Sequence, residues 1–371
     1  MSDSCNTATI LSREHFSGPQ AAHQPQDDQP AGQDAAACVQ AEAVLDVVES
    51  LTAGHGGEGA GIARNGAAWT VQERHSRFWS ARLDQDRASI RPAQTRLRAA
   101  GSFGAESLVT PCGLEPGADG ALWVTSLGGE RLSALSPQGE PVRHVPLPGA
   151  RPWGLFQADQ TGQTGLDGQG SLWVCDFANS LLLRIGLDGT LEQRLPVRVA
   201  GQDLRPILGA AHHTAGGQEL YLILADGSGR NRRLARLRAD ADPALELLPC
   251  PVAIPSGVRV HGGRLFVSSQ NPPALLSRPL EGGAWTGFSS GLLPEYLTQF
   301  AFAGEHAWLA ARGRLARLGT TGAVELVVDA AALAGYPESN FCGLAALHGP
   351  DGPTLFVADN IHNLIHSFRL G

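Results

Sequence analysis

The sequence predicts an all-β protein: a seven-bladed β-propeller of four-stranded antiparallel sheets, with a six-bladed ring as the alternative. Three observations support this fold. An apolar triplet with a central aromatic recurs along the chain, the copies lie 42 to 54 residues apart, and turns rich in Gly, Pro and Asp separate them. Repeats of this length are typical of propeller blades. The central aromatics are Trp69, Trp123, Trp173, Tyr221, Phe266, Trp308 and Phe356.

Each repeat contains the same succession of elements, as the unit around Trp173 illustrates. Gly154-Leu155 marks a first strand, 172–174 a second strand and 183–185 a third strand, with a Gly-containing turn before the second. A fourth strand over 191–197 precedes the next unit. Both faces of such a sheet pack against neighbouring blades, so its strands need not alternate strictly between apolar and polar residues.

The two ends of the repeat region predict how the ring closes. The chain ends at Gly371, where the third strand of the last unit finishes. Residues 44–48 resemble residues 326–329, which precede the last unit. We therefore expect 44–48 to pair with the last blade as its fourth strand, which removes exposed sheet edges. The alternative is that residues 43–51 form a short amphipathic helix outside a six-bladed ring.

Composition indicates one folded domain and a flexible arm. We expect the propeller over residues 42–371 as a single domain. Residues 1–41 are rich in Gln, Ala, Asp, Ser and Pro, and this composition predicts a flexible N-terminal arm. The sequence shows no pattern of an export signal and no run of eighteen apolar residues, so we expect a soluble, cytoplasmic protein.

Cysteine spacing and charge exclude several kinds of chemistry. The six cysteines have neither close pairs nor the spacing of metal ligands, which indicates free thiols in a reducing compartment. All 28 basic residues are Arg, so no lysine is available for a Schiff base or as a general base. The formal net charge of −8 argues against nucleic acid as a partner, and we expect no membrane partner either.

Two units resemble a known repeat. Residues 355–360, followed by 363–368, resemble an NHL repeat, in which an apolar strand is followed by Asp, a polar loop with Asn and another apolar strand. Residues 172–179 form a second good match, while Ser126, Ser269 and Ala311 stand where the repeat has Asp. Streptogramin lyases and hydrolases of the gluconolactonase and SMP-30 type have similar blades.

This resemblance implies two classes of function. NHL propellers commonly bind proteins, peptides or RNA, whereas the lyases and lactonases use a divalent metal at the central mouth. In the lactonase group the metal lies among a Glu, an Asn and an Asp. Here the corresponding openings carry no carboxylate, and only Glu58 and Asn340 could partly substitute. A fold shared by several activities does not choose between them.

Several residues that could carry chemistry have simpler structural interpretations. We expect Asp176 and Asp359 to accept backbone N–H bonds in the loops that follow them. His212-His213 should lie in a turn on the face opposite the mouth. Cys112 and Cys342 should be one blade apart at the channel, too far for a disulfide.

The best functional indication is a group of arginines around the predicted mouth. Loops before the first strands and loops after the second strands of a propeller converge on one face, and Arg outnumbers carboxylates in them. Several guanidinium groups around a concave mouth favour an anionic ligand, and aromatic residues could add stacking surface. The predicted ligand-binding residues are Arg151, Trp153, Arg205, Arg230, Arg312, Asn340 and Phe341.

We therefore expect a non-enzymatic, NHL-like propeller that binds an acidic peptide, an acidic protein or an anionic small molecule without a cofactor. The alternative is a metal-assisted lyase or hydrolase of a cyclic ester, with a divalent cation in the central channel.

Overall fold

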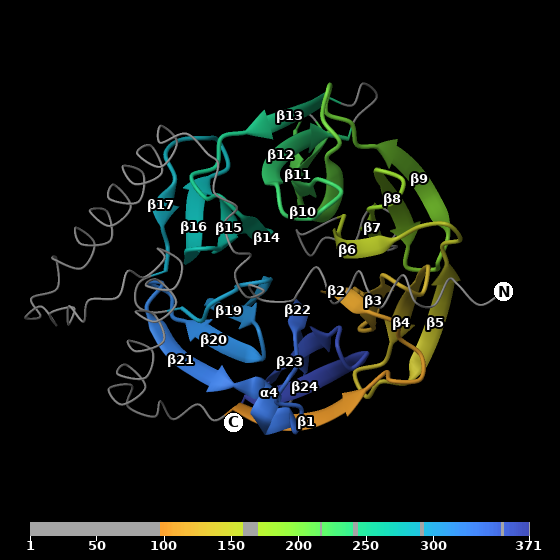
Figure 1. Cartoon of the computed structure of the whole chain (residues 1–371), viewed down its shortest axis with the longest axis vertical. Helices are drawn as coiled ribbons and strands as arrows, with labels where there is room; N and C mark the ends of the chain where they lie inside the picture. Colours follow the sequence, from red (N-terminus) through yellow and green to blue (C-terminus); the bar gives the residue numbers. More distant parts are fainter. Residues whose placement is uncertain are drawn as a thin grey trace, which may run out of the picture. The chain divides into compact units, whose positions relative to one another are not determined.

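The chain forms a six-bladed β-propeller in the computed structural model. Six four-stranded antiparallel sheets surround a common axis (Figure 1). The first strand of each sheet contacts the first strand of the next, and the first strand of the last sheet contacts that of the first. The structure describes residues 97–158, 170–215, 217–239, 244–289, 293–349 and 352–370.

Each blade is a meander that runs from an innermost to an outermost strand. Blade 1 consists of β2 (Pro111–Pro116), β3 (Leu122–Ser126), β4 (Arg131–Leu135) and β5 (Pro141–Pro146). Blade 2 consists of β6 (Pro152–Gln157), β7 (Ser171–Asp176), β8 (Leu181–Gly186) and β9 (Leu191–Pro196). Blade 3 consists of β10 (Arg205–Thr214), β11 (Gly217–Ala225), β12 (Arg232–Arg238) and β13 (Ala244–Leu248).

The second half of the ring repeats this arrangement. Blade 4 consists of β14 (Pro255–His261), β15 (Arg264–Gln270), β16 (Pro273–Pro279) and β17 (Thr286–Gly287). Blade 5 consists of β18 (Phe300–Ala303), β19 (His306–Ala311), β20 (Arg314–Leu318) and β21 (Val324–Asp329), followed by the short helix α4 (Ala330–Ala334). Blade 6 consists of β22 (Phe341–Gly349), β23 (Gly352–Asp359), β24 (Leu364–Leu370) and β1 (Leu97–Phe103).

The recurring aromatic triplets are the second strands of the blades. Six of the seven predicted aromatics lie in β3, β7, β11, β15, β19 and β23, and all six are buried. The prediction of seven blades is wrong, because β22 of blade 6 packs directly against β2 of blade 1 and leaves no place for a further sheet between them. Trp69, around which the seventh unit was expected, lies outside the described residues.

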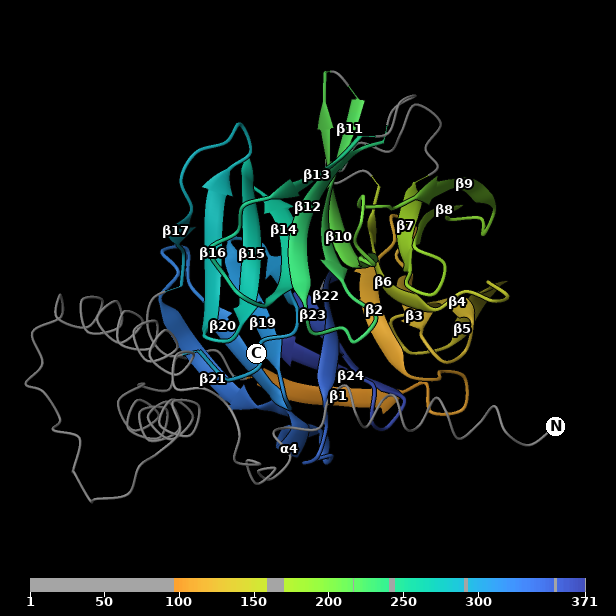
Figure 2. The ribbon, with the colours of Figure 1, turned by 45° about the horizontal axis from the view of Figure 1, so that its top comes forward.

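The ring closes by the predicted type of pairing but through a different segment. β1 pairs antiparallel with β24, from Leu97 opposite Leu370 to Phe103 opposite Ile365. Figure 2 shows β1 beside β24 at the edge of the last blade. A strand that precedes blade 1 therefore completes blade 6, as expected, but it is 97–103 and not 44–48. Residues 1–96 lie outside the described residues, so the expectations for 1–41 and for 43–51 stay predictions.

Glycines near the start of the innermost strands allow neighbouring blades to approach each other. A Cβ atom on Gly154 would lie 2.4 Å from the carbonyl oxygen of Ile207, and one on Gly343 would lie 2.3 Å from that of Cys112. Real side chains do not tolerate such distances, so glycine is required at these positions. The repeated Gly-Leu pair in the sequence thus reflects contact between blades.

A buried ion pair spans the axis of the ring. Arg259 Nη2 of β14 lies 3.0 Å from Glu115 Oε2 of β2, and each side chain is only 9% exposed. Blades 1 and 4 stand opposite each other in the order of the six blades. Burial raises the pKa of the Glu115 carboxyl, although the attraction of Arg259 opposes this. Leu114, Leu208 and Val258 belong to one apolar cluster beside the pair, so the interior of the ring is packed.

Candidate functional site

One face of the propeller carries both sets of loops predicted to form the mouth. In blades 2, 3 and 6, the start of the innermost strand pairs with the end of the second strand: Pro152 with Asp176, Arg205 with Ala225, and Phe341 with Asp359. The loops that lead into the first strands and those that leave the second strands therefore lie on the same face, as predicted. We call this face the mouth face.

Two of the predicted arginines on the mouth face have no partner for their charge among the described residues. Arg151 is half-buried, and its position is fixed by its main chain. Its N–H donates to Asp176 Oδ1 at 3.0 Å, and its carbonyl accepts from the Phe177 N–H at 3.0 Å. Arg230 is exposed in the turn between β11 and β12, where its N–H donates to Ser228 Oγ. Blades 2 and 3 thus each present a predicted arginine whose guanidinium group has no carboxylate partner among the described residues.

The other two predicted arginines are already engaged. Arg205 forms two hydrogen bonds with the Asp203 carboxylate, both at 3.0 Å, and lies 5.4 Å above the ring of Phe177. Arg312 is exposed and lies 5.0 Å above the ring of Tyr296. These arginines are held in fixed orientations, but the charge of Arg205 is balanced by its own neighbour.

The predicted aromatic residues are buried more deeply than expected. Trp153 is 9% exposed and its ring lies 5.1 Å from that of Phe177. Phe341 is fully buried, and its ring lies 5.8 Å from the imidazole of His366. Phe341 therefore does not offer the open stacking surface that the sequence analysis anticipated, because it belongs to the apolar core between blades 5 and 6.

Carboxamide side chains lie on the mouth face of blades 5 and 6. Asn340 Nδ2 donates to Asn360 Oδ1 at 2.9 Å, and both side chains are buried. The Asn360 Nδ2 donor and the Gln299 Oε1 acceptor are buried without a hydrogen-bond partner in the described part of the chain. Most buried polar groups in proteins are satisfied, so such atoms can mark a place where a ligand or water binds.

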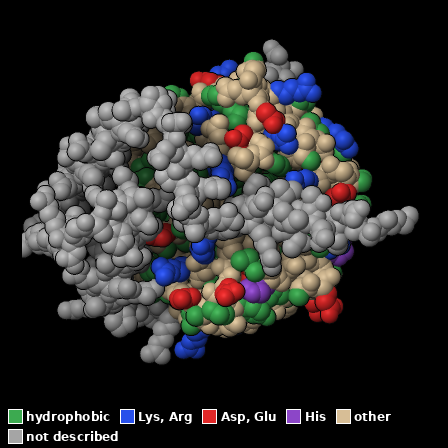
Figure 3. Space-filling model, in the orientation of Figure 1, with side chains coloured by type: hydrophobic (Ala, Val, Ile, Leu, Met, Phe, Trp, Pro, Cys, Tyr) green, Lys and Arg blue, Asp and Glu red, His purple; other side chains and the backbone are tan. Residues whose placement is uncertain are grey.

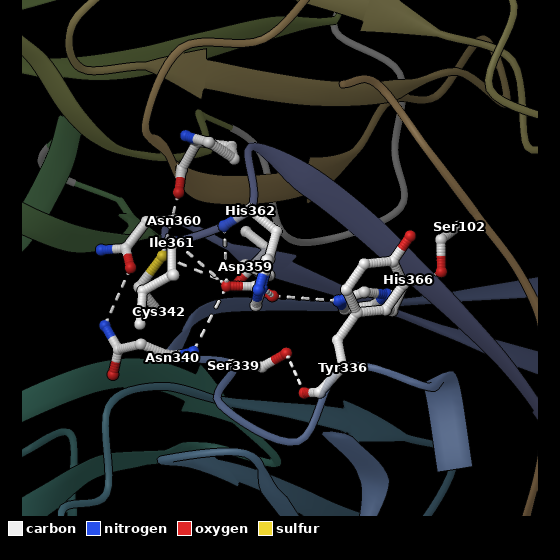
Figure 4. Close-up of polar contacts among 12 residues, drawn as sticks. Ser102, Tyr336, Ser339, Asn340, Cys342, Asp359, Asn360, Ile361, His362 and His366 are labelled. Atoms are coloured by element: carbon white, nitrogen blue, oxygen red, sulfur yellow. Dashed lines mark hydrogen bonds and ion pairs between the residues drawn. The ribbon is translucent and has the colours of Figure 1, made fainter. Parts of the chain in front are cut away.

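Asp359 forms the centre of a polar network in blade 6 (Figure 4). Its Oδ1 atom accepts hydrogen bonds from the backbone N–H groups of Asn340, Ile361 and His362. Its Oδ2 atom lies 2.6 Å from His362 Nδ1 and 3.2 Å from His366 Nε2. On the far side of His366, Nδ1 lies 2.7 Å from Ser102 Oγ.

The charge state of Asp359 follows from its partners. Burial alone would raise the pKa of this carboxyl, but hydrogen bonds from His366, Ser339 and His362 outweigh it and hold the pKa well below the usual 3.8. The carboxylate is therefore ionised at neutral pH. It consequently fixes the tautomer of each imidazole, because the nitrogen facing it must carry a proton.

A short helix places the aromatic cover of this network. Asp329 caps α4 by accepting the N–H of Ala332 at 3.0 Å, and Gly335 ends the helix in the left-handed conformation with φ 83°. The chain then turns so that the Tyr336 ring lies 5.0 Å from that of His362 and 5.2 Å from that of His366.

The predicted roles of the two aspartates are confirmed. Asp176 accepts the N–H groups of Arg151 and Asn179, and its Oδ2 accepts Asn179 Nδ2 at 2.7 Å. Both aspartates accept hydrogen bonds from backbone N–H groups of the loop that follows, and from the N–H of the residue that leads into the innermost strand of the same blade. His212 and His213 lie on the opposite face, as predicted, but they belong to the end of β10 and not to the turn that follows it.

Sequence reasoning missed the histidines around Asp359 as a group. None of His362, His366 and Ser102 is singled out in the sequence analysis. His362 and His366 follow Asp359 by three and seven positions, and the blade 2 residues at the same spacing are Asn179 and Leu183. This difference between two otherwise similar repeats was the available signal. No local signal pointed to Ser102, which reaches the network only through ring closure.

The expected separation of Cys112 and Cys342 is wrong. Blades 1 and 6 are direct neighbours in a six-bladed ring, whereas a seventh blade had been assumed between them. The Cys342 thiol donates to the Pro111 carbonyl oxygen at 3.0 Å. Burial raises the pKa of this thiol, and the Cys112 side chain, which hydrogen bonds with it, raises it further. All four described cysteines are free thiols.

Charge on the visible surface is mixed. In the view of Figure 3, arginine and carboxylate side chains are interspersed over the described blades and form no field of one sign. In the described part of the chain, no group of three or more His, Cys, Asp or Glu side chains is arranged to hold a metal ion. Glu58 lies outside that part. Within the same part, no helix has the length and apolar character needed to cross a membrane.

Comparison with known proteins identifies the fold but not the family. No protein-family model and no curated protein matches the sequence. A gluconolactonase from Xanthomonas campestris matches over 77% of this chain and 93% of its own, with 16% identity and a TM-score of 0.55. A catalytically inactive virginiamycin B lyase from Staphylococcus aureus, solved with quinupristin, matches over 75% of this chain and 100% of its own, with 14% identity and a TM-score of 0.52.

A calcium-binding protein, regucalcin, from Agrobacterium tumefaciens matches over 73% of this chain and 93% of its own, with 16% identity and a TM-score of 0.54. The resemblance to NHL-type, streptogramin lyase and gluconolactonase propellers is therefore confirmed at the level of the fold. At these identities the comparison carries no activity over to this chain.

Proposed function

We propose that this chain is a binding propeller whose mouth face holds an acidic peptide or protein, or an anionic small molecule. One observation carries the proposal: Arg151 and Arg230 lie on the mouth face of neighbouring blades, and neither has a carboxylate partner among the described residues. Guanidinium groups are usually paired when they are partly buried, and a planar fork of donors fits a carboxylate.

The local structure holds Arg151 ready for a ligand. Asp176, which accepts the backbone N–H of Arg151, uses Oδ1 for backbone N–H groups and Oδ2 for Asn179. The Asp176 carboxylate therefore forms no ion pair with the Arg151 guanidinium, which remains available to bind an anionic ligand. Two such groups on adjacent blades offer an anionic partner two charged contacts, although the whole chain is acidic.

The carboxamides on the mouth face favour a peptide over a simple anion. Asn360 Nδ2 is an unpaired buried donor and Gln299 Oε1 is an unpaired buried acceptor. A peptide carries both carbonyl oxygens and N–H groups, so it can satisfy both kinds of atom while its acidic side chains reach the arginines. Asn340 orients Asn360 through its own hydrogen bond and so acts as a positioning residue.

The test uses octaglutamate with a fluorescent label, titrated with the full chain and followed by anisotropy. We expect Arg151→Gln with Arg230→Gln to weaken binding about tenfold, since two charge-assisted contacts are lost. The matched control is Arg194→Gln with Arg238→Gln, which makes the same change of charge away from the mouth face. Arg194 is exposed on the outermost strand β9, and Arg238 ends β12 on the opposite face.

Equal weakening by both pairs of substitutions would show that only the net charge matters and would contradict the proposal. Competition by free glutamate and by citrate distinguishes the ligand classes. Weak competition by these small anions supports an acidic peptide, whereas strong competition supports a small-molecule site. Nucleic acid and membranes are not proposed as partners. A cytoplasmic location stays a prediction, with which the free thiols are compatible.

A further inference from the structure

The contacts around His366 arrange three side chains as a nucleophile, a base and an orienting carboxylate. Ser102 Oγ lies 2.7 Å from His366 Nδ1, and His366 Nε2 lies 3.2 Å from Asp359 Oδ2. We infer that Ser102, His366 and Asp359 form a nucleophilic centre on blade 6 that accepts acyl groups from simple esters. This centre is separate from the proposed binding function, because Ser102 lies on the outermost strand β1 and not in a loop of the mouth.

The protonation states required for this chemistry follow from the hydrogen bonds. Asp359 accepts hydrogen bonds on both carboxylate oxygens, and it is ionised. The carboxylate therefore binds the Nε2–H of His366, which leaves Nδ1 unprotonated toward Ser102. The Ser102 hydroxyl consequently donates a hydrogen bond to His366 Nδ1, which is the arrangement of an activated serine.

The three residues of the proposed centre differ in burial, as a nucleophilic centre requires. His366 and Asp359 are fully buried, whereas Ser102 is exposed. The base and its orienting group are thus shielded from water, and the nucleophile remains accessible. Ala99, Ala100 and Gly101 precede Ser102 on the same strand and are also exposed. Such small residues leave the hydroxyl sterically open and supply no deep acyl pocket, so we expect short acyl esters with a good leaving group.

The proposed reaction balances without a further reagent. Ser102 Oγ attacks the ester carbonyl carbon while His366 Nδ1 takes the hydroxyl proton. The carbon–oxygen bond to the alcohol breaks, and the same imidazole returns the proton to the departing alkoxide or phenoxide. Water then attacks the acyl-serine in the same way and releases the carboxylic acid. Asp359 keeps His366 oriented and stabilises the imidazolium that forms in each step.

A second serine–histidine pair in the chain provides an internal control. In blade 1, Ser133 Oγ lies 3.0 Å from His144 Nδ1 across the corresponding strands β4 and β5. There the serine is fully buried and the histidine is exposed. Ser126 stands where blade 6 has Asp359, and in the described part of the chain no carboxylate forms a hydrogen bond with the His144 imidazole. A serine–histidine pair that only links two strands is expected to have these features: a buried serine, an exposed histidine and no carboxylate partner.

The experiment is to expose the native full-length chain to a fluorophosphonate probe and to find the modified residue by peptide mass spectrometry. We expect an adduct on Ser102, formed with loss of fluoride, and no adduct on Ser133. Ser102→Ala should abolish labelling and should lower p-nitrophenyl butyrate hydrolysis at least tenfold. Ser133→Ala should leave both unchanged. Heat-denatured chain should not be labelled, because the relay exists only in the fold.

His366→Gln should reduce labelling at least tenfold, and a circular dichroism melt shows whether that variant is folded. Should it fail to fold, the site of the adduct on the unmutated chain still decides the question. Absence of a Ser102 adduct on the native protein, or ester hydrolysis that persists in Ser102→Ala, would overturn the inference. Ser102 would then only fasten β1 to β24.

Discussion

Blades 2 and 6 place an aspartate at the same point and use it differently. Asp176 and Asp359 both end the second strand, and both accept the N–H of the residue that leads into the innermost strand. In blade 2 the remaining oxygen binds Asn179, whereas in blade 6 it faces two imidazoles. The backbone role of the aspartate belongs to the repeat, and the residues three and seven positions later decide which chemistry accompanies it.

Because the two aspartates have different partners, the mouth face carries different functional groups on blades 2 and 6. In blade 2 the carboxylate is fully used by neighbouring groups, so Arg151 retains an uncompensated charge. In blade 6 the carboxylate instead orients His362 and His366. The same repeat thus presents a cation in one blade and ordered imidazoles in another.

The largest expected effect is on stability. Replacing Asp359 or Asp176 tests whether the two aspartates contribute as differently as their contacts indicate. Asp359→Asn should lower the free energy of unfolding by about 3 to 4 kcal/mol, because a fully buried carboxylate with charged or polar donors on both oxygens is replaced. Asp176→Asn should cost only about 1 to 2 kcal/mol, since its Asn179 partner can rotate its amide. Urea unfolding of both variants measures the difference. Equal losses would remove the distinction between the blades.

Acid should reveal the same distinction with a smaller effect. The pKa of Asp359 is lower in the folded protein than its ordinary value of 3.8. Its contribution to stability is therefore complete above that ordinary value and is lost as the pH falls below about 4, with a slope of up to about 1.4 kcal/mol per pH unit. Asp359→Asn should flatten this part of the stability profile relative to the unmutated chain. An unchanged slope below pH 4 in that variant would show that other groups cause the acid sensitivity.

The smallest expected effect concerns the turn that follows each aspartate. Ser180 in blade 2 and Asn363 in blade 6 occupy the same place, with φ of 55° and 58°. Ser180→Gly should stabilise the protein by about 0.5 kcal/mol, because glycine adopts this conformation without strain. Asn363→Gly should instead destabilise it by about 0.5 to 1 kcal/mol, because Asn363 Oδ1 accepts the Thr110 N–H at 2.7 Å. Thermal melts of the two variants should shift in opposite directions, and shifts of the same sign would contradict this account.

The sequence was sufficient to predict the blades but not their number. The six aromatic strands were found correctly because a buried aromatic and a Gly-Leu pair recur for physical reasons in every blade. Trp69 stands in the triplet Ala68-Trp69-Thr70, the copy that matches the others least well, and it lies outside the described residues. The closing strand 97–103 was missed because its sequence is rich in Ala and Gly and carries little strand signal.

The candidate site was predictable only where its parts are local. The roles of Asp176 and Asp359 follow from the residues beside them, so they were identified correctly. The burial of Phe341 and the proximity of Cys112 to Cys342 depend on which blades are neighbours. Arg205 and Asp203 lie two positions apart in the sequence, and they form an ion pair in the structure. Their spacing alone could not predict the pair, because an arginine at this distance from an aspartate can also be unpaired.

The most direct test of the central claim, that uncompensated arginines on the mouth face hold an acidic partner, is the salt dependence of octaglutamate binding. Affinities of the unmutated chain and of Arg151→Gln with Arg230→Gln would be compared at roughly 50 and 150 mM salt. The account predicts that the unmutated chain binds more tightly at low salt and that the difference between the two narrows as salt rises, because screening weakens the arginine contacts. Identical affinities of the two proteins at both salt concentrations would contradict it.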